Sequence, residues 1–179
     1  MQTKPGMTNS AMRNGLYIGL LFSLNTILSA TGNATLSALT NLVLVAIIVL
    51  VYRFTKNYRD KDLRGFISFR RAFAYVLLLF LFASIIAAAT KFILFTYIKP
   101  DFLGEVFNET LSVLDEVMPS LPDQAFDVVD TLSEPINYSL LSIWGNMFYG
   151  VLLGIILGLV VRRKPGPFDT VPENLSENN

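Results

Sequence analysis

The sequence predicts an all-α integral membrane protein, a four-helix bundle with an amphipathic helical segment between its third and fourth spans. Three observations carry this prediction. First, 53% of the 179 residues are hydrophobic and 16% are charged, against about 45–50% and 25% in soluble domains. Second, the apolar residues lie in long runs without charge. Third, cations and carboxylates occupy different connecting segments.

The first two spans form a helical hairpin. No charged residue occurs between Asn14 and Tyr52, and one helix of that length would measure about 58 Å. Because the hydrocarbon core is only about 30 Å thick, the run must fold back. Gly32 and Asn33 are turn formers, so we expect spans at 14–30 and 35–52.

The third and fourth spans follow at 72–98 and 138–161. Pro100 discourages continuation of the third span, and Arg162, Arg163 and Lys164 end the fourth. The membrane domain is thus predicted over 14–164, between a short cytoplasmic head (1–13) and a polar, Pro-rich cytoplasmic tail (165–179) that we expect to be disordered.

The charges of the connecting segments predict the orientation. The segment 53–71 holds half of the fourteen cations against two acids, namely Arg53, Lys56, Arg59, Lys61, Arg64, Arg70 and Arg71. The segment 99–137 carries nine acids and one lysine. Because Lys and Arg near span ends mark the cytoplasmic side, we expect both termini and 53–71 in the cytoplasm of a cell with an inner membrane, and 99–137 in the periplasm. The seven cations either hold their segment against anionic headgroups or serve as a solvated topogenic loop.

Two alternatives to this topology also fit parts of the sequence. Arg13, the apolar run Leu16–Leu28 and the following "GNA" also fit a cleaved signal peptide, although the equally apolar run to Tyr52 favours the hairpin. A soluble helical bundle is the other alternative, but its helices would show a polar face at every turn. The second and third spans show none.

Part of the chain resembles a known family. The residues are "KNYRD" at 56–60, "GFISF" at 65–69, Ala72–Phe73 at the head of the third span, and "PDF" at 100–102. They are similar to a pattern in domain-of-unknown-function family 4199, an uncharacterised inner-membrane family of Bacteroidota. The resemblance covers about 14–164 and implies a four-span protein without any known activity, so it carries over no functional residue.

Lys91, Asn25 and Asn146 are the candidate polar residues inside the spans. Lys91 is the only charged residue within a span, and an intramembrane ionisable residue is by default a functional hypothesis. It lies eight residues before Lys99, about 12 Å from the helix end. Its expected partners are acids of 99–137, or Asn25 or Asn146. Pairing or snorkelling and a role toward a substrate or proton are both open.

Gly150, Gly154 and Gly158 recur at every fourth position of the fourth span. Such a stripe allows close approach of another helix, either an internal one, for which Ala83, Ala87 and Ala88 offer small side chains, or one from a partner. The segment Phe102–Met118 has apolar residues at helical spacing with acids opposite, which predicts an amphipathic lid on the outer leaflet or across the bundle.

These features favour binding over catalysis. The chain has no His and no Cys, which excludes Ser-His and Cys-His nucleophiles, and no predicted span holds a carboxylate. We therefore expect no enzyme, no catalytic residue, no cofactor and no metal site, and balanced charge argues against nucleic acid. The expected function is that of an accessory or scaffolding protein that engages the lipid bilayer, a membrane-protein partner or further copies of itself, with a subunit of a transporter or channel as the alternative.

Overall fold

The chain forms long helices joined by short connections. The computed structural model describes residues 6–117 and 123–163. In that part the elements are α1 (Met7–Ser29), α2 (Ala34–Asn57), α3 (Phe69–Ile93), α4 (Phe102–Val117), α5 (Asp123–Ser133) and α6 (Pro135–Val161). Five-residue π-helical turns, η1 (Tyr58–Asp62) and η2 (Leu94–Ile98), extend α2 and α3. The predicted all-α class is confirmed within these ranges.

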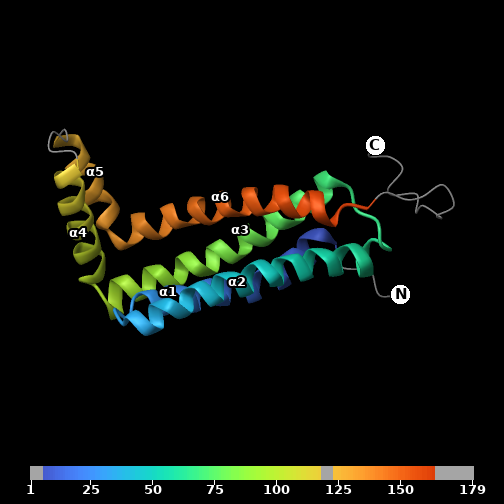
Figure 1. Ribbon diagram of the computed structural model, residues 1–179, viewed down its shortest axis with the longest axis horizontal. Coiled ribbons are helices and arrows are strands. Elements are labelled where there is room, and N and C mark those ends of the chain that lie inside the picture. Colours follow the sequence, from blue (N-terminus) through green and yellow to red (C-terminus); the bar gives the residue numbers. More distant parts are fainter. Residues whose placement is uncertain (1–5, 118–122, 164–179) are drawn as a thin grey trace.

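The four long helices α1, α2, α3 and α6 run side by side, and α4 and α5 stand across one end (Figure 1). We call this the acidic end. The opposite end, where α1 begins, α2 passes into α3 and α6 ends, is called the basic end. The helix α3 occupies the middle, packed closely against α1 on one side and α6 on the other. In contrast, α2 packs mainly against α1 and touches α3 and α6 much less.

Three helical stretches within the described residues are long and apolar enough to cross a membrane, namely Ala38–Asp62, Phe69–Ile98 and Pro135–Val161. They indicate a membrane protein. The 23-residue α1 is long enough, but Arg13, Asn14 and Asn25 make it less apolar.

The outer surface of the long helices supports the same conclusion. Side chains such as Leu42 on α2 and Trp144, Phe148 and Val160 on α6 are more than half exposed. Soluble proteins rarely expose apolar surface continuously along whole helices, whereas helices in a bilayer direct such side chains to lipid.

Local sequence explains where the helices begin and end. The chain turns between α1 and α2 at Gly32, whose φ of +71° suits a residue without a side chain. At the basic end Gly65, with φ +91°, reverses the chain before α3. The Ser68 side chain then accepts a hydrogen bond from the backbone N–H of Arg71 and caps α3.

Glycines hold α6 against α3. A Cβ added at Gly150 would lie 2.8 Å from the Cβ of Phe80, and one at Gly158 would lie 2.8 Å from the ring of Phe69. Gly154 faces Phe73 in the same way. The stripe therefore packs internally, with phenylalanines rather than the small residues Ala83, Ala87 and Ala88 opposite it.

A second set of small residues holds α1 against α3 and was missed by the sequence analysis. An added Cβ would lie 2.9 Å from the Cβ of Phe82 at Gly15, and 2.8 Å from the Cβ of Ile86 at Gly19. One turn further, the hydroxyls of Ser23 and Thr90 lie 2.7 Å apart. Both α1 and α6 therefore pack closely against α3, and this packing sets the relative positions of the three helices.

Candidate functional site

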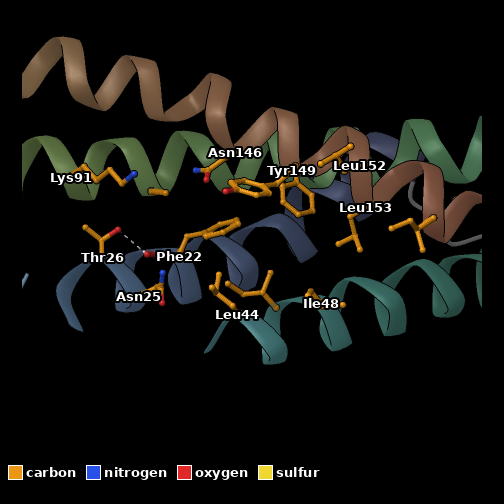
Figure 2. Close-up of a pocket in the computed structure, with 14 residues that line it drawn as sticks. Phe22, Asn25, Thr26, Leu44, Ile48, Lys91, Asn146, Tyr149, Leu152 and Leu153 are labelled. Atoms are coloured by element: carbon orange, nitrogen blue, oxygen red, sulfur yellow. Dashed lines mark hydrogen bonds between the residues drawn. The ribbon is translucent and has the colours of Figure 1, made fainter. Parts of the chain in front are cut away.

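A cavity of about 520 Å³ lies among the four long helices. Fourteen of the described residues line it, three each from α1, α2 and α3 and five from α6. Figure 2 shows these side chains converging on the space between α2 on one side and α3 and α6 on the other. We call this cavity the lateral cleft.

The lateral cleft gathers the three candidate polar residues that the sequence places on three different helices. Asn25 comes from α1, Lys91 from α3 and Asn146 from α6, and all three line the cavity. Nothing in the local sequence around any of them predicts this meeting, because it depends on how α1 and α6 pack on α3.

Lys91 has an aromatic neighbour instead of an acid. Its ammonium lies 5.3 Å from the centre of the Tyr138 ring, a distance at which the ring face attracts a cation. Among the described residues the one ion pair joins Arg59 to Asp60, so the expected carboxylate partner of Lys91 is not found there. Lys91 is half-buried, and its charge is left with a ring as its neighbour.

The amide of Asn25, which lines the same cavity, is also incompletely bonded. The side-chain oxygen of Asn25 is buried and accepts no hydrogen bond from the residues that the structure describes. Thr26, in contrast, satisfies its own hydroxyl by donating to the carbonyl oxygen of Phe22 at 3.0 Å (Figure 2). A buried acceptor without a donor is costly, so Asn25 and Lys91 together make the cleft a place where a polar group would be stabilised.

The cleft is polar toward one end and apolar toward the other. Asn25, Thr26 and Lys91 lie toward the acidic end, because α1 and α3 both finish there. Leu153 and Ile156 lie toward the basic end, where α6 finishes. In Figure 2 the labelled polar side chains accordingly lie to the left of Leu152 and Leu153.

The cleft opens sideways between α2 and α6. These two helices make few contacts with each other. Leu44 and Ile48 on α2 and Leu152 and Ile156 on α6 line the cavity and are also exposed at the surface. A molecule could therefore enter from the surroundings of the helices without passing through either end.

The residues that resemble the family pattern lie mostly at the basic end, and several of them make contacts that stabilise the fold. Arg59 donates from Nη1 to the carbonyl oxygen of Val161 at 3.1 Å and from Nε to Asp60 at 2.7 Å. Ile67 and Arg163 exchange two backbone hydrogen bonds, of 3.2 and 3.0 Å. These contacts fasten the end of α6 to the connection between α2 and α3, and we call them the basic-end clasp.

The model of one protein family matches residues 13–163, and its description is "Protein of unknown function (DUF4199)". The chain belongs to this family. No curated protein and no solved structure matches it. The family resemblance seen in the sequence is thereby confirmed, and any activity must be argued from the site.

Of the other cations between residues 53 and 71 of this DUF4199 protein, all except Arg71 are more exposed than Arg59. Those classed as exposed are Arg53, Lys56, Lys61, Arg64 and Arg70, while Arg71 is half-buried. Lys56 and Lys61 lie on the helical extension formed by the end of α2 and η1. The basic segment is therefore partly a projecting helix and not wholly a loop.

Two tyrosines stack behind the clasp. The rings of Tyr58 and Tyr75 lie parallel at 4.3 Å between centres, and the Tyr75 hydroxyl accepts a hydrogen bond from Asn14 at 2.8 Å and lies 3.4 Å from that of Ser10. This buried contact joins α1, η1 and α3, and explains structurally why a tyrosine stands in the middle of "KNYRD".

The acidic end of the DUF4199 protein is fastened by aromatic side chains. Phe95 stacks on Phe102 at 5.3 Å, and the Tyr138 ring meets both Phe95 and Phe107 edge-on. Since Tyr138 also contacts Lys91, one residue connects α4 to the lateral cleft. Sequence reasoning missed Tyr138, because an aromatic residue at the head of a span is ordinary.

The acids of α4 and α5 form no metal centre in the described part of the chain, where no three potential ligands gather. A smaller cavity of about 380 Å³ lies between these helices, beside Phe107, Asn108 and Asp130.

Proposed function

We propose that this DUF4199 protein is a four-span protein of a bacterial inner membrane, without enzymatic activity, that acts as an accessory or scaffolding factor by binding a membrane component in its lateral cleft. The component is a lipid or a helix of a partner. The observation that supports the proposal best is the sideways opening of a partly polar cavity between α2 and α6.

The four-span topology rests on lengths and charges. With 23 residues, α1 measures about 35 Å, enough to cross a hydrocarbon core of about 30 Å. It lies along α3 and exposes Leu16, Leu20 and Ile27 on its outer side. With α1 as the first span, both termini and the Arg-rich connection share the cytoplasmic side.

The absence of an enzymatic role is argued from chemistry. The chain contains no His and no Cys, and none of the described residues that line the lateral cleft is a carboxylate. The remaining ionisable groups that line it are Lys91 and Tyr149. A lone lysine beside asparagines does not supply a general-base pair.

The proposal moves the binding surface away from the glycine stripe. Gly150, Gly154 and Gly158 are occupied by α3, so a partner helix cannot use them without displacing it. The faces of α2 and α6 that border the cleft are exposed, and they are the surfaces that we assign to binding.

A transporter or channel subunit is the second candidate function. It is favoured by the meeting of Lys91, Asn25 and Asn146 in one cavity, because carriers group their few intramembrane polar residues at a substrate site. Carriers also commonly use helices that are interrupted within the membrane. In α3 the departure from α-helical geometry is the turn η2, which lies at the end of the helix and not in its middle.

Site-specific cross-linking would test the binding role. The chain lacks Cys, so single cysteines can carry a photoreactive group at Leu152, which lines the cleft, or at Leu159, which does not. Both are exposed residues of α6. We expect one defined lipid or protein adduct from position 152 in native membranes and only scattered adducts from 159.

Equal, scattered adducts at both positions would contradict the binding role. The transport alternative has its own measurement, since electrogenic flux through liposomes that contain only the purified protein would support it. Lys91→Met should then abolish that flux.

A further inference from the structure

We infer that the lateral cleft binds a single-chain anionic amphiphile, a long-chain fatty acid, with its carboxylate at Lys91 and its hydrocarbon chain toward Ile156. This inference rests on the proposed function, in which the cleft is a binding site that faces the membrane. It adds the charge of the ligand, the number of its hydrocarbon chains and the direction in which it lies.

The charge of the ligand follows from Lys91. An ammonium group has three donors, and in the described part of the chain its neighbour is the face of the Tyr138 ring, with no carboxylate within 4.0 Å. A cation in apolar surroundings is stabilised by an opposite charge with hydrogen bonds. Among the described residues no acid lines the cleft, so the ligand supplies the negative charge.

The two asparagines suit a carboxylate head. Asn146 carries an amide N–H₂ that can donate to one carboxylate oxygen. The buried side-chain oxygen of Asn25 lacks a donor among the described residues. A lysine ammonium has three N–H groups, so an ammonium that donates to a carboxylate can also donate to this oxygen.

The direction of the ligand follows from the gradient of polarity along the cleft. The polar residues lie toward the acidic end and the apolar ones toward the middle and the basic end. A lipid of the outer leaflet has this same direction, with its head outward and its chain toward the bilayer centre. Entry between α2 and α6 would keep the chain in apolar surroundings throughout.

Depth and volume favour one chain with a small head. Lys91 lies seven residues before Ile98, where η2 ends, and thus about 10 Å inside the end of the helical stretch. A diacyl phospholipid would have to draw its phosphate and glycerol that far from the interface, whereas a carboxylate is a much smaller head to desolvate. The cavity volume of about 520 Å³ is within the range of about 300–1,000 Å³ that is usual for small-ligand sites.

Equilibrium binding of radiolabelled palmitate tests the inference. The full-length protein is placed in nanodiscs of phosphatidylcholine, and binding to empty nanodiscs is subtracted. We expect saturable binding that unlabelled palmitate displaces and that methyl palmitate, which has the same chain without the charge, does not.

Matched variants locate the site. Lys91→Met should weaken palmitate binding at least about tenfold, because it removes a charge-assisted hydrogen bond, and Lys91→Arg should retain binding. Ile156→Trp fills the apolar part of the cleft and should weaken binding, whereas Ile155→Trp, at an exposed neighbour outside the cleft, should not.

Four results would overturn the inference: no saturable binding, unchanged binding by Lys91→Met, equal displacement by methyl palmitate, or equal displacement by phosphatidylglycerol. None of them would remove a defined cross-link from position 152. Loss of that cross-link is the result that contradicts the proposed function itself.

Discussion

Helix α6 has two sides that differ in packing and chemistry. Toward α3, its glycines bring the backbone against the phenylalanines at 69, 73 and 80, and Gly150, Gly154 and Gly158 are buried. Toward α2, larger side chains such as Leu152 and Ile156 border a cavity and remain exposed. Close packing makes the side toward α3 a rigid support. Packing is incomplete on the side toward α2, which leaves room for a ligand.

A small-residue stripe and a surface open to binding are thus separate properties of one helix. The stripe is the strongest pattern in α6, yet it serves the interior of the protein. The open side has no repeating motif, because lining a cavity requires only that residues from several helices meet.

The largest expected effect is at the packed side. Gly150→Ala should lower the free energy of unfolding in detergent by up to about 3 kcal/mol, the upper end for overpacking, because its Cβ would lie 2.8 Å from that of Phe80. Gly145→Ala on the same helix meets nothing within 4 Å and should leave stability unchanged or slightly raised. If both substitutions had the same effect, close packing of α6 on α3 would be refuted.

A smaller effect is expected at the basic-end clasp. Arg59→Ala removes the hydrogen bond to the Val161 carbonyl and should cost about 1–2 kcal/mol, since a hydrogen bond with a charged partner contributes roughly that much or more. Thermal unfolding would measure it, with the exposed Arg53→Ala as control. Hydrogen exchange should also become faster in the last turn of α6, and unchanged exchange there would argue against the clasp.

The smallest effect is expected at the open side. Lys91→Met should change the free energy of unfolding by no more than about 1 kcal/mol, because the lost cation–π attraction is offset by removing a half-buried charge. Lys99→Met is the matched control, since Lys99 donates to the backbone oxygen of Ala30 and its loss should destabilise the protein. A large loss with Lys91→Met would mean that the lysine supports the fold and not a ligand.

The sequence predicts where the helices lie along the chain better than it predicts which helices pack against one another. Charge-free runs and Gly32 are local signals, and they indicated the all-α class and long apolar helices that the structure contains. The predicted span 35–52 ends at Tyr52, whereas the helix continues through Asn57 and η1 to Asp62. The helix continues because the polar residues 53–62 contain nothing that would break it.

The site could be predicted only as separate residues. Lys91, Asn25 and Asn146 stand out because polar groups are rare in apolar spans, but their meeting depends on packing between distant segments. The spacing of Gly15, Gly19 and Ser23 on α1 was a readable signal of close packing. The role of Tyr138 was not, because its ring contacts come from η2 and α4 together.

In the proposed topology the four long helices cross the membrane with α2 and α6 toward lipid, and the role of the lateral cleft depends on that orientation. Single cysteines at Lys61 on η1 and Glu116 on α4 can be exposed to a membrane-impermeant thiol reagent in intact cells. We predict that position 116 is labelled and that position 61 is labelled only after the membrane is opened. Labelling of position 61 from outside together with protection of position 116 would contradict the topology and the roles assigned from it.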